Sequence, residues 1–536
     1  MMKTSRRNIL LASLGAAQLA LLGRYGLRSA LAGPTPTGPT KLLCIWLDGG
    51  CNWEHFFTPL SGAGIDKFIR PPEGGQHPFG YSKEQVRNFD KTTPDLSDPS
   101  TKRKLRGPVS WNDQNPGDTT GVNPFSGGTQ NYRPWGYSWV DPNYKLYERA
   151  CLLVGADQGT ASHASGIVAS MCGVAGSTFR APSVQAVIAN YMMSYFPDRP
   201  VPNAYLGGIS PAAMGLPAAV TPYSLTSLAM VESTISDRRD SAWKGLRERK
   251  DVPAVGFDGK PGTGTVPLTV TDDLVLQAIR GGRGRSTTGT DTLYQQLHDT
   301  YIGVSKTIAR DVLTKLEATK GFEQLDKDPL YSGGPFATAC IGSADICGPV
   351  RNGGPFDFAL RLLKSNLVTS LTLRATSISN TSFDMHFSGG ARAQTSHLRI
   401  SMEAIGQLLN EMSLTKASSG NGTLLDETLV YIYSDFGRTF ARSGEDGSDH
   451  HPATCGLLVG GGVKGNQMLG GYDESATGSP LGAPVSLIEE SGEKVTRTPS
   501  SQDIVATVIR AFGLVPGKDF FIPGGYGAFD GALETA

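Results

Sequence analysis

The sequence lacks an apolar run long enough to cross a membrane comfortably. The nearest approach is residues 9–23, which are interrupted by Gln18 and followed by Arg24 and Arg28. A membrane-spanning helix needs about 20 predominantly apolar residues, and this stretch offers about fifteen. We therefore expect no transmembrane span in the mature chain.

The chain also lacks a surplus of basic charge, since 49 Lys and Arg are matched by 49 Asp and Glu. Five of the basic residues and none of the acidic ones lie in the first 32 residues, which leaves 44 basic against 49 acidic residues beyond them. A protein that binds nucleic acid neutralises phosphates with surplus Lys and Arg. The composition therefore argues against nucleic acid as a partner.

Cysteine is scarce, with seven in 536 residues and no CxxC or zinc-finger spacing. This absence argues against a structural zinc held by cysteines. Cys340 and Cys347 bracket a short loop, and we predict a disulfide between them if the protein is exported. Glycine and proline are abundant instead, at 67 and 34 residues, so long irregular loops should join the regular elements.

The N-terminus has the pattern of an export signal. Residues 5–10 read Ser-Arg-Arg-Asn-Ile-Leu, a weakly apolar stretch follows, and Ala30-Leu31-Ala32 offers a cleavage site. We predict a twin-arginine signal peptide over residues 1–32, passage through the twin-arginine export machinery, and a periplasmic or secreted mature protein. The alternative is an uncleaved N-terminal anchor. Because this route carries folded proteins, a cofactor can be loaded before export, although the route does not require one.

Strands and helices alternate along the mature chain. We expect strands at 41–47, 150–154, 367–373, 428–434 and 454–459, and helices at 163–173, 182–195, 291–320, 356–364, 393–413 and 501–513. This alternation predicts an α/β fold with a mostly parallel central sheet flanked by helices. We expect one domain over residues 33–536, with irregular insertions at about 61–145 and 235–350.

Polar side chains capable of metal or acid–base chemistry follow four of the expected strands, and a histidine lies on the loop after the last. They are Asp48; Thr160, Ser162 and His163; Asp384 and His386; Asp435 and Arg438; and His450. The carboxyl ends of parallel strands meet at one sheet edge, where ligands of α/β proteins bind. Carboxylates with imidazoles suit zinc or manganese, and oxygen ligands alone suit calcium or magnesium.

Each of these residues also has a purely structural interpretation. Asp48 could only cap a turn, Ser162 could only be the N-cap of the next helix, and Arg438 could be a structural partner of Asp435. Of His450 and its neighbour His451, we expect one to face the site. Asp449 could orient that histidine.

The motifs together resemble the domain-of-unknown-function 1501 family of exported bacterial proteins. The resemblance rests on SDFGRT at 434–439, Asp449-His450, GGGVKG at 460–465, Asp384-x-His386 and Ser162-His163, together with the twin-arginine start. That family in turn resembles the alkaline phosphatase superfamily, which includes sulfatases and phosphodiesterases.

The more distant resemblance implies an alkaline-phosphatase-like fold with a metal held by Asp48, Asp384, His386, Asp435 and His450. It implies Thr160 or Ser162 as the nucleophile. Phe436 stands where the superfamily usually has a histidine, which favours one ion, or none, over a full two-metal site. Zinc, manganese and calcium all remain candidates.

Three functional hypotheses follow. The first is a metal-dependent hydrolase of phosphate or sulfate esters, in which Thr160 or Ser162 attacks, His163 lies beside them and Arg438 binds the anionic ester. The second is a non-catalytic protein that uses a phosphatase-like scaffold to bind a glycan or a partner at the cell surface. The third is a metal-free polysaccharide hydrolase with Asp384 and Asp435 as acid and base.

Overall fold

A computed structural model describes most of the chain. The described residues are 38–69, 83–96, 102–108, 136–193, 195–196, 199–216, 220–225, 252–255, 261–266, 312–332, 354–375, 383–384, 386, 390–440, 448–490, 492–516, 520, 522 and 526–534. The predicted signal peptide, the Cys340–Cys347 disulfide and most of the predicted 291–320 helix lie outside them.

The chain forms two compact units. One comprises residues 1–35, 193–200 and 227–318, and its described part includes an antiparallel pair of strands, β7 (Val252–Val255) and β8 (Pro261–Val266). The other comprises residues 36–192, 201–226 and 319–536. It holds every residue that the sequence predicts for the site.

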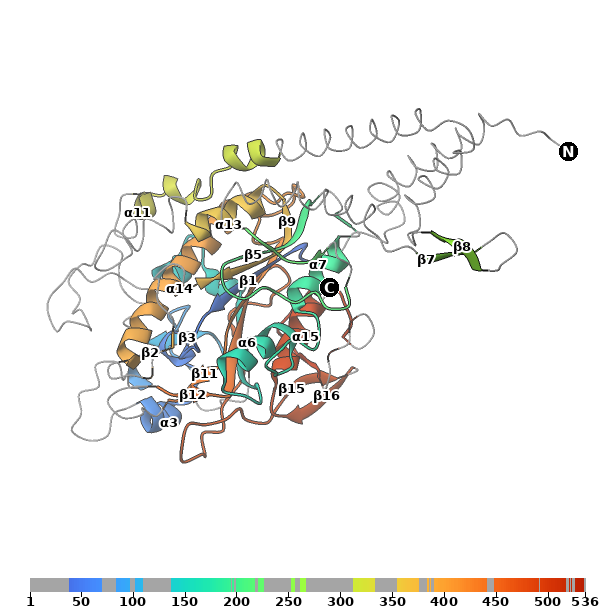
Figure 1. Cartoon of the computed structure of the whole chain (residues 1–536). Helices are drawn as coiled ribbons and strands as arrows, with labels where there is room; N and C mark the ends of the chain where they lie inside the picture. The colour runs from blue at the N-terminus through green and yellow to red at the C-terminus, as the bar shows by residue number, and fades with distance from the viewer. Residues whose placement is uncertain are drawn as a thin grey trace. The chain divides into compact units, whose positions relative to one another are not determined.

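An eight-stranded sheet forms the centre of the larger unit, in the order β14-β4-β13-β10-β1-β9-β5-β6 (Figure 1). The strands are β14 (Gln467–Gly470), β4 (Ala150–Asp157), β13 (Ala453–Gly460), β10 (Thr428–Ser434), β1 (Lys41–Leu47), β9 (Val368–Arg374), β5 (Val201–Leu206) and β6 (Tyr223–Ser224). All neighbouring pairs are parallel except the two that β13 makes with β10 and β4. The predicted α/β fold with a mostly parallel sheet is therefore confirmed.

Helices cover the sheet on both faces (Figure 1). On one face α6 (His163–Cys172), α7 (Val184–Met192) and α15 (Ser501–Ala511) pack against one another and against β4, β10, β1, β9 and β5. On the other, α13 (Pro355–Lys364) packs on β9 and on α14 (Gly390–Leu414), which contacts α5 (Tyr137–Val140). Nearly every residue of β1, β4, β10 and β13 is buried, as a sheet covered on both faces requires.

Residues 61–145, predicted as an irregular insertion, contain only short elements in their described parts. They include α3 (Gly62–Gly64), a π-helical turn at Ile65–Ile69, and the paired strands β2 (Val86–Asn88) and β3 (Arg106–Pro108). Arg106 is 1% exposed and donates hydrogen bonds to the carbonyls of Thr58, Leu60 and Asp95. A buried guanidinium thus satisfies backbone oxygens that no strand or helix pairs.

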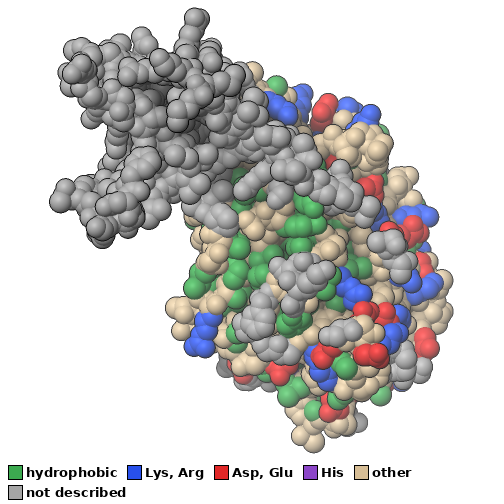
Figure 2. All heavy atoms as spheres, turned by 90° about the vertical axis from the view of Figure 1, so that its right-hand side faces the viewer, with side chains coloured by type: hydrophobic (Ala, Val, Ile, Leu, Met, Phe, Trp, Pro, Cys, Tyr) green, Lys and Arg blue, Asp and Glu red, His purple; other side chains and the backbone are tan. Residues whose placement is uncertain are grey.

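Two further observations concern the surface. Among the described helices, none combines the length and the apolar character that crossing a membrane requires. In the view of Figure 2, hydrophobic side chains lie in the middle of one face and charged side chains gather mainly to one side.

Candidate metal centre

The strand ends gather polar groups at one edge of the sheet. β1 ends at Leu47 and is followed by Asp48, and β10 ends at Ser434 and is followed by Asp435. β9, which is parallel to β1, ends at Arg374. β4 runs parallel to β10 because β13 is antiparallel to both, so the loop that leads from β4 to α6 starts at this edge as well. This is the edge at which α/β sheets bind ligands.

A short ribbon brings His450 to the same edge. β11 (Gly437–Arg438) pairs antiparallel with β12 (His450–His451), and Arg438 lies opposite His450. His450 is half-buried at the site, whereas His451 is buried and its Nδ1 accepts a hydrogen bond from the Ala453 N–H. The expectation that one of the two adjacent histidines faces the site thus agrees with their placement.

Asp435 is buried beneath this edge and binds three donors. Its side chain is 2% exposed. Oδ1 accepts from Trp46 Nε1, and Oδ2 accepts from the Gly49 N–H at 3.1 Å and from His163 Nδ1 at 2.7 Å. A carboxylate can only accept, so Nδ1 of His163 carries the proton. This hydrogen bond is the main reason why the pKa of His163 is raised above its usual value.

A glycine lets the helix that carries His163 approach Asp435. A Cβ at Gly166, in the first turn of α6, would lie 2.1 Å from the Asp435 carbonyl oxygen. No other residue type can occupy that position without moving the helix or the end of β10. The approach sets the imidazole of His163 directly against the buried carboxylate.

His450 is held in the same manner by a different oxygen. Its Nδ1 donates to the carbonyl of Ala161 at 2.7 Å, in the loop before α6, so its Nε2 is the unprotonated nitrogen of the neutral ring. Burial lowers the pKa of His450, which favours that neutral form. The ring of Phe436 contacts both histidines, with centroid distances of 4.7 Å to His163 and 4.3 Å to His450.

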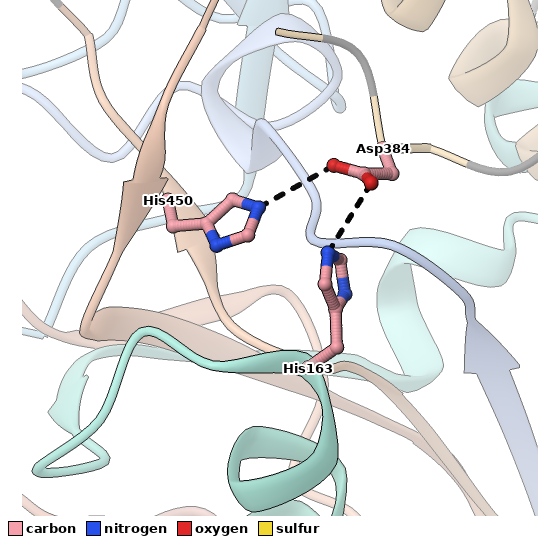
Figure 3. A group of neighbouring side chains, drawn as sticks. All are labelled: His163, Asp384 and His450. Atoms are coloured by element: carbon pink, nitrogen blue, oxygen red, sulfur yellow. Dashed lines mark hydrogen bonds and ion pairs between the residues drawn. The ribbon is translucent and has the colours of Figure 1, made fainter.

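The carboxylate of Asp384 lies between the two Nε2 atoms (Figure 3). Oδ2 is 3.3 Å from Nε2 of His163, and Oδ1 is 3.4 Å from Nε2 of His450. Arg438 donates to Oδ1 at 2.6 Å. Burial opposes ionisation of Asp384, but the hydrogen bond and charge of Arg438 outweigh it, so the pKa of Asp384 is lowered. The carboxylate is therefore ionised at neutral pH.

These three side chains fit a divalent cation. One atom from each of His163, Asp384 and His450 lies within 4.8 Å of the other two. Nε2 of His163 is buried, makes no hydrogen bond of good geometry and lies 3.3 Å from the Asp384 carboxylate, so a cation bound between them would satisfy it. Metal-binding histidines usually donate their second nitrogen to a carboxylate or backbone carbonyl, as both do here. Two nitrogens and one carboxylate oxygen suit zinc or manganese better than calcium.

The other predicted ligands lie around this group. Asp435 binds His163, and Asp48 pairs with Arg374. His386 is 45% exposed, with its Nε2 2.9 Å from Oδ1 of Asp384 and its ring stacked on His450. His163 was predicted beside the nucleophile, but the position of its Nε2 beside Asp384 and His450 places it among the candidate ligands.

The predicted nucleophiles lie just before α6. Ser162 is exposed and occupies the N-cap position, but its side chain makes no capping hydrogen bond. Thr160 is half-buried, and its Oγ1 accepts from the backbone N–H of Ser162 at 3.2 Å. Ser162 thus holds the N-cap position that the structural interpretation gave it, without a side-chain capping hydrogen bond, and both hydroxyls stay candidates.

Arg438 is placed differently from an anion-binding residue. Its side chain is 0% exposed, and its guanidinium donates to Asp384 and to the carbonyls of Gly49 and Ser448. The structural alternative named Asp435 as its partner, whereas the hydrogen-bonded carboxylate is Asp384. Sequence reasoning did not single out Arg374, Trp46 or Gly166. The only available signal was that Arg374 ends a strand.

Comparison with known proteins supports the family resemblance in part. Residues 348–526 match the family described as "Protein of unknown function (DUF1501)". This match confirms the resemblance over a stretch that includes the Asp384-x-His386, SDFGRT and Asp449-His450 motifs. No curated protein matches the chain.

A solved structure described as that of BT4656 in complex with its substrate D-glucosamine-2-N,6-O-disulfate is weakly similar. The sequence identity is 10%, the alignment covers 74% of this chain and 79% of the other, and the TM-score is 0.23. At that score the similarity carries no argument about fold or function.

Proposed function

We propose that this protein binds one divalent cation, zinc or manganese, through Nε2 of His163, Nε2 of His450 and the carboxylate of Asp384. The observation that carries the proposal is the arrangement of the two imidazoles. Each donates its Nδ1–H to an oxygen, Asp435 for one and Ala161 for the other, and each directs its Nε2 at the same carboxylate. In this proposal Asp435 orients a ligand and is not a ligand itself.

We further propose that the protein is a metal-dependent hydrolase of phosphate or sulfate esters, built on an alkaline-phosphatase-like scaffold and exported by the twin-arginine route. A bound cation would polarise an ester oxygen and lower the pKa of a nearby hydroxyl or water. Asp435 keeps His163 in one tautomer, and Arg438 holds Asp384 in place. Thr160 and Ser162 supply hydroxyls just before α6, whose N-terminal N–H groups favour an anion.

A second candidate, binding without catalysis, is favoured by one observation. Arg438, the predicted anion-binding residue, is fully buried and donates to Asp384 and two backbone carbonyls. A protein that lacks an arginine for its substrate would bind a cation, and through it a glycan or a partner, without turning over an ester. The two candidates share the metal centre and differ in turnover.

Elemental analysis of the protein purified without chelator tests the metal centre. We expect about one zinc or manganese per chain in the wild type, and loss of it in His450→Gln. His451→Gln is the matched control, because this adjacent histidine is buried, accepts a hydrogen bond from Ala453 and is not part of the candidate ligand group, so it should leave the metal content unchanged. A wild-type protein without metal, also after incubation with zinc or manganese, would rule out both candidates.

Turnover then separates the two candidates. The metal-loaded wild type is screened on phosphate and sulfate monoesters and diesters, beside His450→Gln and Asp384→Asn. Hydrolysis that disappears with the metal supports the hydrolase. Stoichiometric metal without turnover of any ester in the screen supports the binding protein.

A further inference from the structure

A second arginine lies at the site edge, and it differs from Arg438 in being open to solvent. Arg374 is the last residue of β9, and its side chain is 39% exposed. Its guanidinium donates to Oδ2 of Asp48, the residue that follows β1. It also lies over the ring of Trp46, with Cζ 5.6 Å from the ring centroid. The strand register places Arg374 beside Trp46.

The surroundings of Arg374 are built to hold it. The loop after β5 carries Gly207 and Gly208, both with positive φ, at 74° and 80°. A Cβ at Gly208 would lie 2.5 Å from the Trp46 ring, so this position needs glycine both for its backbone conformation and for its close approach. Trp46 is consequently 6% exposed, fixed by the loop on one side. Arg374 rests on a rigid aromatic surface.

Two contacts join this arginine to the candidate metal centre. Trp46 donates from Nε1 to Asp435, the carboxylate that orients His163. The backbone carbonyl of Asp48 accepts a hydrogen bond from the Phe383 N–H at 2.7 Å, and Phe383 directly precedes Asp384. Arg374 is therefore linked to His163 through Trp46 and Asp435, and to Asp384 through Asp48 and Phe383. Burial is the main reason why the pKa of Asp48 is raised, and the nearby charges of Asp435, Arg374 and His163 also affect it, so the partner of Arg374 lies within electrostatic reach of a proposed ligand.

We propose that Arg374, and not Arg438, is the residue that binds the anionic group of the substrate, and that Asp48 occupies its guanidinium until an anion replaces it. A guanidinium presents several N–H donors in one plane and binds carboxylate, phosphate or sulfate oxygens in pairs. The oxygen of Asp48 stands where an oxygen of the anion would bind. This inference rests on the proposed function, because it assigns the substrate-binding residue of the same site.

The proposed exchange leads to a specific prediction for Asp48. If Asp48 competes with the anion for Arg374, removing its charge should strengthen anion binding. A purely structural ion pair predicts a different result, because the loss of either partner would leave anion binding unchanged or weaken it. The two variants Arg374→Gln and Asp48→Asn should therefore act in opposite directions.

The test is calorimetric titration of the full-length protein with inorganic phosphate and with inorganic sulfate, as purified and after metal removal. We expect Arg374→Gln to weaken binding at least about tenfold, the loss typical of a hydrogen bond to a charged group. We expect Asp48→Asn to strengthen it. The matched control is Arg510→Gln, since Arg510 is 43% exposed and paired with Glu489 in much the same way. It should have no effect.

The outcomes separate this inference from the proposed metal centre. Equal anion affinity in the wild type, Arg374→Gln and Asp48→Asn overturns the inference, even where the protein holds a full complement of metal. Anion binding that depends on Arg374 in a protein that takes up no metal supports the inference and rejects the metal centre. If Arg374→Gln does not fold, Arg374→Lys replaces it in the test, because lysine keeps the positive charge but cannot donate two hydrogen bonds in one plane to an anion. Weaker binding by a folded lysine variant supports the inference, and unchanged binding contradicts it.

Discussion

Replacement of Asp435 tests the reasoning about the metal centre most directly. In the proposal Asp435 never contacts the cation but holds His163 through Nδ1, so its loss should weaken metal binding without removing a ligand. Carboxylates in this position typically contribute 10–100-fold to metal affinity, which corresponds to about 1.4–2.7 kcal/mol at 25 °C. We expect Asp435→Asn and Asp435→Ala to lower metal affinity by amounts at opposite ends of that range.

Asparagine has the shape of aspartate but offers one oxygen instead of two. Oδ2 of Asp435 receives two donors, from Gly49 and His163, and Oδ1 receives one, from Trp46. The amide therefore prefers the orientation that places its oxygen toward His163 and its NH2 group toward Trp46. His163 keeps an acceptor, now neutral, and we expect Asp435→Asn to lower zinc affinity by about tenfold. Asp435→Ala removes the acceptor, and we expect about 100-fold.

The assay is competition for zinc against a chromophoric chelator at fixed pH, beside urea denaturation to show that each variant is folded. Asp357→Asn is the control, because Asp357 is a buried carboxylate that pairs with Arg361 within α13. It should keep wild-type zinc affinity. A folded Asp435→Ala protein that binds zinc within about twofold of the wild type would refute the orienting role of Asp435.

Three further predictions concern stability and are measured by denaturant unfolding. Gly166→Ala should cost about 1–3 kcal/mol, because its Cβ would overlap the Asp435 carbonyl oxygen, whereas Gly478→Ala meets nothing within 4 Å and should be nearly neutral. Arg106→Ala should cost about 3 kcal/mol, because it leaves the buried carbonyls of Thr58 and Leu60 without their donors; unchanged stability would show that water replaces it. Lys41 is 0% exposed and pairs with Glu427. Burial opposes the ionisation of Glu427, but the charge of Lys41 promotes it more strongly, so the pKa of Glu427 is lowered. A carboxylate whose pKa is lower in the folded protein than in the unfolded chain contributes its full stabilisation at pH values above the unfolded-state pKa. For Glu427 we therefore expect this contribution to decline as the pH falls below about 4.5 and to be lost once the pH has passed below the folded-state pKa. Glu427→Gln should lose that part of the pH dependence and be less stable at neutral pH; identical acid unfolding curves for variant and wild type would contradict this.

Much of the architecture could be predicted from the sequence. The strand predicted at 41–47 is β1, and those at 150–154, 367–373, 428–434 and 454–459 match β4, β9, β10 and β13 to within three residues at either end. Apolar, β-branched runs that end in Asp, Gly or Ser identify buried strands well. The antiparallel direction of β13 could not be predicted, because a strand buried on both faces has the same pattern in either direction.

The sequence by itself determined which residues reach the edge of the sheet, because an acid or a histidine that follows a parallel strand must emerge there. Asp384 and His163, on the loops after β9 and β4, were found in this way, whereas the β11–β12 ribbon brings His450 to the edge. The tertiary structure alone decided which group pairs with which. Asp435 is hydrogen-bonded to His163, the buried Arg438 donates to Asp384, and Arg374 donates to Asp48. Such partnerships depend on strand register, side-chain rotamers and burial, which are set by packing between segments hundreds of residues apart, and no local pattern records them.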